Sequence, residues 1–288
     1  MKRFLIRLMA FSAILATVIA FLIVFRLYLT SKIDWHIPAN KTVVFMGASQ
    51  VSRDVDFSLM ENAYNLSKPS ERYIFTYAKL RKIIENNPQV KTVVLQCAPT
   101  DLWQNSDDKY FVENEMSEFV PLFYPLLDKE MLHDYSGHYV DMIKFIIQHS
   151  LDFQDFKGRR YLGRIGFGYQ SETLLEGTFD RSSVTPKMIQ GEYGNKVNIK
   201  YLHKIIDYCN QHELILYLIY FPMYHPEYFY DQDYYYERIK ELGDVNYLDY
   251  SHFEMDDSLR FDAHHLNKNG AAVFTRQLCK DLNVTYTK

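Results

Sequence analysis

The sequence contains few cysteines, and their spacing does not suggest a structural role. Cys97, Cys209 and Cys279 are the only three in 288 residues and lie far apart, so no CxxC pair or Cys/His cluster indicates a metal site. Cys97 lies in an apolar run and Cys279 on the apolar face of a predicted helix. We therefore expect buried free thiols and a domain without disulfides, even in a compartment that would permit them.

An excess of basic residues is also lacking. The 32 Lys and Arg are outnumbered by 36 Asp and Glu, the formal net charge is −4, and no basic stripe runs along the chain after its N-terminal part. Nucleic-acid-binding domains usually carry such a stripe. A nucleic-acid partner is therefore not expected.

A long uncharged apolar run lies near the N-terminus. Leu8–Phe25 contains only Ser12 and Thr17 as polar residues and is long enough, with its flanks, to cross the hydrocarbon core of a bilayer. Three basic residues precede it. They predict a single-pass anchor with its N-terminus in the cytoplasm and the rest of the chain on the far side of the membrane.

Two other interpretations of this run are weaker. Alanines within it resemble a signal-peptide cleavage site, but Phe21–Phe25 continues the apolar run past them. A buried core helix would rarely be so uniformly apolar at the start of a chain. We therefore predict a cytoplasmic tip and anchor over residues 1–30, a connector over 31–41 and one large domain over 42–288.

Apolar, β-branched runs alternate with helical patterns over most of this domain. Strands are predicted at 42–46, 63–66, 92–97, 214–221 and 245–248. Helices are predicted from Pro69-Ser70 to about 86, at 198–211 and at 268–282. This alternation is typical of βαβ units and of a mostly parallel sheet covered on both faces.

The middle of the domain, at about 105–194, is less regular. It has a helical pattern near 139–149 and then a loop-rich region with several glycines. We interpret this stretch as an insertion that covers or frames a site.

Sites in open α/β sheets form at the carboxyl ends of strands. Ser49, in Gly47-Ala48-Ser49-Gln50, directly follows the first predicted strand and is either a nucleophile or a helix-capping serine. The segment Asp262-Ala263-His264-His265 precedes the last predicted helix, for which Asn267 is a plausible N-cap.

An aspartate three residues before a histidine can accept a hydrogen bond from one imidazole nitrogen and leave the other as a base. This spacing selects His265 as the base and leaves His264 as a packing or surface neighbour. Taken alone, the Asp262–His265 spacing is also consistent with a hydrogen-bonded surface loop.

Together, Ser49 and the segment Phe261–Ala271 (FDAHHLNKNGA) make the chain resemble the SGNH (GDSL-like) hydrolases. The resemblance covers about Val43–Leu282, with a poor match in the insertion. It implies a three-layer α/β/α, flavodoxin-like fold in which Ser49, His265 and Asp262 form a catalytic triad without a metal or organic cofactor.

The first three motifs depart from that family's usual pattern. Gly47-Ala48-Ser49 replaces Gly-Asp-Ser, Ser70 takes the place of the usual oxyanion-hole glycine, and Thr100 takes that of the usual asparagine. The resemblance assigns the oxyanion hole to the N–H groups of Ser49 and Ser70 and to Thr100. Losing one such donor typically costs about 2.7–4 kcal/mol of transition-state stabilisation.

The expected function is hydrolysis of O-acyl esters, most simply O-acetyl, on a cell-envelope glycan, because a soluble metabolite would not require a tethered enzyme. Transfer of an acyl group to an envelope polymer is the enzymatic alternative. The altered motifs support a third interpretation, a non-catalytic scaffold or glycan-binding protein. Pro222–Pro226 is a candidate lining of a pocket or a simple turn, and Tyr228–Tyr236 either stacks on sugar rings or packs on the domain surface.

Overall fold

The computed structural model describes residues 1–102, 113–149, 157–168, 174–186 and 196–287. The chain divides into two compact units, one formed by 1–34 with 111–164 and the other by 35–110 with 165–288. The predicted insertion therefore contributes residues to both units.

The first unit is helical. It contains α1 (Lys2–Ser31), α6 (Glu113–Phe123), α7 (Lys129–Asp134), α8 (Tyr139–Gln148), α9 (Gly158–Arg164) and the 3₁₀ turns Tyr124–Leu126 and Ser136–His138. α6 packs against α8, and the Tyr161 hydroxyl of α9 donates a hydrogen bond to the Leu122 carbonyl at 2.8 Å. These helices order part of the segment that the sequence predicts to be irregular.

α1 is long and apolar enough to cross a membrane. Its 30 residues extend about 45 Å at 1.5 Å per residue. Most of its large apolar side chains are exposed, and Phe4, Phe11 and Phe21 are more than half exposed. Exposed apolar side chains along the whole helix are typical of a segment whose surroundings are lipid.

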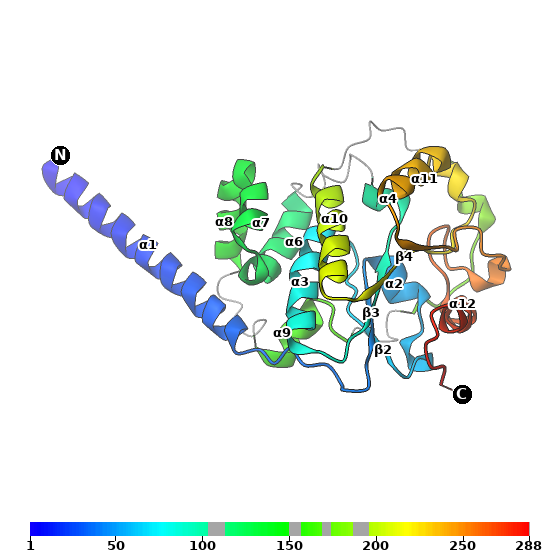
Figure 1. Cartoon of the computed structure of the whole chain (residues 1–288). Coiled ribbons are helices and arrows are strands. Elements are labelled where there is room, and N and C mark those ends of the chain that lie inside the picture. The colour runs from blue at the N-terminus through cyan, green and yellow to red at the C-terminus, as the bar shows by residue number, and fades with distance from the viewer. Residues whose placement is uncertain (103–112, 150–156, 169–173, 187–195, 288) are drawn as a thin grey trace. The chain divides into compact units, whose positions relative to one another are not determined.

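The second unit is built on a five-stranded, fully parallel sheet (Figure 1). Its strands are β1 (Val43–Met46), β2 (Ala63–Asn65), β3 (Thr92–Gln96), β4 (Ile215–Tyr220) and β5 (Asn246–Asp249). They lie in the order β2-β1-β3-β4-β5, which is the flavodoxin-like order. The strand order reverses between β1 and β3, so ligands are expected at the carboxyl ends of these two strands.

Helices cover both faces of the sheet, with α3 and α10 on one side and α2 and α12 on the other (Figure 1). These helices are α2 (Ser49–Asp54), α3 (Tyr73–Asn86), α4 (Pro99–Leu102), α10 (Lys196–Gln211), α11 (Gln232–Glu241) and α12 (Lys268–Asp281). The 3₁₀ turns are Phe57–Leu59, Arg181–Ser183, Pro226–Tyr228 and Asp257–Leu259. The predicted α/β fold with a parallel sheet and an apolar N-terminal helix is confirmed.

The core follows the alternation of side chains along the strands. Phe45, Val94 and Ile219 point to one face of the sheet and pack with Phe274 and Leu278 of α12. All five are buried. Burial on both faces explains why β1, β3 and β4 are continuous apolar runs.

The connector is attached to the second unit from Trp35 onward. Trp35 and Ile37 are buried, and the Asn87 side chain donates to the Trp35 carbonyl at 2.9 Å and accepts from the Ile37 N–H at 2.8 Å. Asn87 ends α3 and thereby holds the incoming chain at the start of the sheet.

One local expectation is corrected, and two helices were not predicted. The helix predicted to open at Pro69-Ser70 begins at Tyr73, because a turn closed by the Glu71 N–H and the Lys68 carbonyl places Ser70 in the left-handed region at φ 61°. α2 and α11 were not predicted. α2 has only six residues, and α11 is a tyrosine-rich helix of low helical propensity that is held by its buried Tyr235.

Candidate active site

The turn after β1 presents Ser49 as the first residue of α2. Gly47 has φ +135°, and a Cβ built on it would lie 2.5 Å from the Cβ of Gln96. Only glycine fits this backbone without strain. The chain therefore turns sharply at the strand end, which leaves Ser49 half-buried rather than covered by the core.

The structure brings Ser49, His265 and Asp262 together in one hydrogen-bonded chain. The Ser49 hydroxyl lies 3.0 Å from His265 Nε2, and His265 Nδ1 lies 3.1 and 3.0 Å from the two carboxylate oxygens of Asp262. The serine and histidine are 216 residues apart in sequence. This geometry allows His265 to accept the serine proton while Asp262 fixes the imidazole orientation.

The Asp262 carboxylate is held in its ionised form. Burial alone would raise its pKa, but His265 and the backbone N–H groups of His264 and His265 hold the pKa below the ordinary aspartate value. An ionised carboxylate is the form that stabilises an imidazolium at His265.

α2 also binds the loop that carries the histidine. The buried Asp54 accepts from the Leu266 N–H at 2.9 Å, and the Gln50 side chain donates to the His264 carbonyl at 3.2 Å. The short helix therefore carries the serine and positions its partner. Gln50 and Asp54 were not predicted from the sequence, although both lie within five residues of Ser49 and therefore at the same strand end.

The start of α12 completes this arrangement. Asn267 is the predicted N-cap, and its side chain accepts from the N–H groups of Asn269 and Gly270, both at 3.1 Å. The same side chain donates to the carbonyls of Ser258 and Arg260 at 2.6 and 3.2 Å. One asparagine thus holds the helix start and the loop that leads into Asp262.

Gln96, the last residue of β3, joins two of the predicted motifs. Its side-chain oxygen accepts from the Ala48 N–H at 3.0 Å, and the side chain also hydrogen-bonds the Asp101 carboxyl group. Gln96 was not predicted as a site residue from the sequence. Its signal is a lone polar residue at the end of the apolar run Thr92–Gln96, where a buried amide requires partners.

Ser70 lies in the loop between β2 and α3. This loop is joined to the turn that carries Ser49, because the Lys68 N–H donates to the Gly47 carbonyl at 3.1 Å. Among the described residues, the Ser70 N–H has no backbone acceptor. Its left-handed φ of 61° suits glycine and costs a serine about 1–2 kcal/mol.

A buried ion pair holds both ends of the Ser70 loop. The Lys79 ammonium of α3 donates to the Leu66 carbonyl, to Glu71 Oε2 at 2.7 Å and to the Ile165 carbonyl at 2.8 Å. Both charged side chains are fully buried, and Thr76 donates to the other Glu71 oxygen at 2.8 Å. Burial raises the pKa of Glu71 and lowers that of Lys79, and each partner opposes the shift in the other.

Thr100 lies half-buried in α4, directly after the turn that follows β3. Its neighbour Asp101 accepts from the Ala98 N–H at 2.9 Å, so the helix start is capped from within. This turn lies at the carboxyl end of the strand next to β1, on the edge of the sheet that carries Ser49.

We expect Asp101 to make stability depend on pH. Burial raises its pKa to about 6, against the opposing effects of the Ala98 N–H, Arg72 and Gln96. The folded state therefore binds this proton more tightly than the unfolded chain, whose aspartate pKa is about 3.9. The resulting stabilisation is complete below about pH 4 and is lost as the pH rises through 6, a change of about 2–3 kcal/mol.

Urea unfolding of the detergent-solubilised chain between about pH 4 and 7 measures this slope. Asp101→Asn keeps an acceptor for the Ala98 N–H and should flatten the slope. An unchanged slope in the variant would assign the pH dependence to another group.

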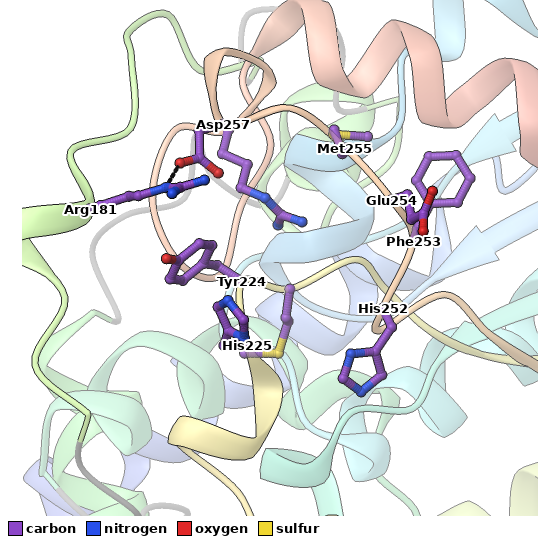
Figure 2. A pocket seen from close by; sticks show the side chains of 10 residues that line it. Arg181, Tyr224, His225, His252, Phe253, Glu254, Met255 and Asp257 are labelled. Carbon is purple, nitrogen blue, oxygen red and sulfur yellow. Dashed lines mark hydrogen bonds and ion pairs between the residues drawn. The ribbon is translucent and has the colours of Figure 1, made fainter.

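The remaining predicted residues lie outside the hydrogen-bonded chain of Ser49, His265 and Asp262. The centres of the His264 and Phe229 rings lie 4.8 Å apart, and burial lowers the pKa of His264. Tyr224 and His225, from the Pro222–Pro226 segment, line a cavity (Figure 2). In the tyrosine-rich stretch, Tyr230 and Tyr235 are buried and Tyr228 is exposed.

The cysteine prediction is confirmed, since all three cysteines are free and buried. Among the described residues, no group of three or more His, Cys, Asp or Glu is arranged to hold a metal ion. No protein-family model matches the chain, and no characterised protein matches it closely enough to indicate a relationship.

Proposed function

We propose that the chain is a membrane-anchored, SGNH-like serine esterase that removes O-acyl groups, most simply O-acetyl, from a cell-envelope glycan. The observation that carries the proposal is the hydrogen-bonded chain from Ser49 through His265 to Asp262. Its position at the strand-order reversal between β1 and β3 supports the same conclusion.

In the proposed reaction, Ser49 Oγ attacks the ester carbonyl while His265 Nε2 accepts the hydroxyl proton. The N–H groups of Ser49 and Ser70, with Thr100, stabilise the oxyanion. His265 then returns the proton to the departing sugar oxygen, which leaves an acyl group on Ser49. Water, activated by His265, releases the acid and restores the serine.

The anchor supports an envelope substrate. α1 would cross the membrane with its basic N-terminal residues in the cytoplasm and the catalytic unit on the far side. An active site anchored on that side of the membrane has access to cell-envelope polymers and not to cytoplasmic metabolites. If a sugar hydroxyl replaces water in the second step, the same residues perform acyl transfer.

A fluorophosphonate probe tests the proposal on the full chain in detergent. The wild-type chain should become covalently labelled, and Ser49→Ala should abolish labelling because the reactive oxygen is removed. Ser58→Ala is the matched control, because this exposed serine lies nearby in sequence and outside the triad. Labelling should be unchanged in that variant.

The opposite result favours a different class of protein. A wild-type chain that is folded and remains unlabelled would support a non-catalytic scaffold, the alternative that Ala48, Ser70 and Thr100 suggest by departing from the usual motifs. For a labelled enzyme, product analysis with and without an acceptor sugar separates hydrolysis from acyl transfer.

A further inference from the structure

A cavity of about 370 Å³ lies beside the loop that carries the triad histidine and aspartate. Arg260 lines the cavity and lies two residues before Asp262 in the sequence. Tyr224 also lines the cavity, and its N–H donates to the Ala263 carbonyl at 2.9 Å. Figure 2 shows Tyr224 and His225 on one side of this cavity and the segment His252–Met255 on the other. The cavity is therefore joined to the catalytic loop but does not contain the triad.

Arg260 has a buried guanidinium group whose hydrogen bonds are incomplete within the described part of the protein. Its side chain belongs to a residue only 5% exposed, and within the described residues its Nε and Nη1 atoms have no hydrogen-bond partner. An unpaired buried guanidinium is costly. Such a group is typical of a site whose partner is a ligand.

The neighbouring carboxyl groups do not supply the missing partner. Asp257 is bound by Arg181 in an ion pair, which Figure 2 marks with a dashed line. Asp54 is fully buried, burial raises its pKa well above the ordinary value, and its Oδ1 accepts from the Leu266 N–H rather than from Arg260. Glu254 lines the cavity but is exposed, where water screens its charge.

Two guanidinium groups and an aromatic ring face the same space. The guanidinium carbons of Arg181 and Arg260 lie 5.9 and 6.0 Å from the centre of the Tyr224 ring. Next to the Tyr224 ring, the rings of His225 and Tyr228 stack with their centres 4.7 Å apart. Guanidinium groups bind carboxylates and phosphates through paired hydrogen bonds, and aromatic faces suit the apolar faces of sugar rings.

We propose that this cavity is a subsite for a negatively charged group on the glycan, a carboxylate or a phosphate. Arg260 binds that group with the help of Arg181, and the ester on the same polymer is thereby placed next to Ser49. The inference rests on the proposed function for its substrate class, but binding at the cavity does not require catalysis.

Equilibrium binding to the full chain in detergent tests the subsite. Tetragalacturonate and its methyl ester share one sugar chain, and methylation removes the charge of each carboxyl group. Glycerol phosphate probes the phosphate alternative. Either acidic probe should bind at least about tenfold more tightly than the neutral ester, and the preference should weaken with salt. Binding by tetragalacturonate alone, or by glycerol phosphate alone, supports the subsite and identifies the source of the charge.

Charge variants locate the interaction. Arg260→Met and Arg181→Gln should abolish the preference, whereas Arg276→Gln, which removes the same charge from an exposed position on α12, should retain it. If Arg260→Met does not fold, Arg181→Gln decides, because the Arg181 side chain is 68% exposed and its replacement is expected to preserve the fold.

Equal binding of acidic and neutral probes, no binding of either acidic probe, or a preference that survives in the arginine variants would overturn the subsite. Fluorophosphonate labelling of Ser49 is measured in a separate experiment, which tests the esterase proposal and not the subsite. Failure of the esterase proposal and failure of the subsite therefore remain distinguishable.

Discussion

Replacing His265 by alanine should lower kcat for ester hydrolysis by about 10⁴- to 10⁶-fold. Among the described residues, His265 is the only histidine whose imidazole lies within hydrogen-bonding distance of the Ser49 hydroxyl. Its Nε2 atom lies 3.0 Å from the Ser49 Oγ atom. Without that base, the serine must lose its proton to water as it attacks. The remaining rate should come from the oxyanion donors and from substrate binding.

Asp262→Asn should cost about 10⁴-fold for a related reason. Both carboxylate oxygens lie within 3.1 Å of His265 Nδ1, so the native pair holds the tautomer with a free Nε2. An amide can present its NH₂ group to Nδ1 and stabilise the opposite tautomer. The folded loop should persist, since the asparagine oxygen can still accept from the backbone N–H groups of His264 and His265.

Kinetics on an acetyl ester, with the fold checked by circular dichroism, measure both effects. The double variant Ser49→Ala/His265→Ala should be no slower than the worse single variant, because residues that act as a unit are not additive. His264→Ala is the matched control, since this histidine packs against Phe229 and lies outside the triad. A comparable loss in His264→Ala would contradict the assignment of the base.

Lys79→Met should lower the free energy of unfolding by about 3–5 kcal/mol. The substitution leaves the Glu71 carboxylate buried without its cation and removes the donor to the Leu66 and Ile165 carbonyls. Because Glu71 directly follows Ser70, the loop that bears Ser70 should also loosen. Urea unfolding measures the stability, and kcat for the acetyl ester reports on the loop.

The exposed pair on the same helix provides the control. Lys82 and Glu85 of α3 lie 2.9 Å apart with side chains 41% and 52% exposed, so Lys82→Met should change stability by only about 0–1 kcal/mol. The double variant Lys79→Met/Glu71→Gln should recover part of the loss, because the uncompensated charge is gone. Equal effects of Lys79→Met and Lys82→Met would show that burial does not govern the pair.

The triad illustrates how far sequence patterns reach into the site. Asp262 and His265 are three residues apart, and their position before a helix capped by Asn267 follows from local sequence. Their approach to Ser49 was expected because strands β1 to β5 run parallel and share one carboxyl edge. The short distance between Ser49 and His265 depends on α2, which is too short to be read from periodicity.

Buried polar residues outside the motifs were not predictable in the same way. Gln96 meets Ala48 across 48 residues, and Lys79 meets Ile165 across 86. A sequence window contains only one partner of each pair, so the polar residue looks like an exception within an apolar or helical pattern. Arg260 is a similar case, because its burial depends on a loop that has no periodicity.

By itself, the sequence determined the apolar N-terminal helix, the parallel α/β class, the free cysteines and the candidate residues Ser49, Asp262 and His265. These follow from local composition and from hydrophobic periodicity, which short segments contain in full. Only the tertiary structure decided the left-handed conformation of Ser70, the buried Lys79–Glu71 pair and the cavity beside Arg260. Each depends on contacts between segments distant in the chain, and burial, not residue type alone, determines which charges remain unpaired.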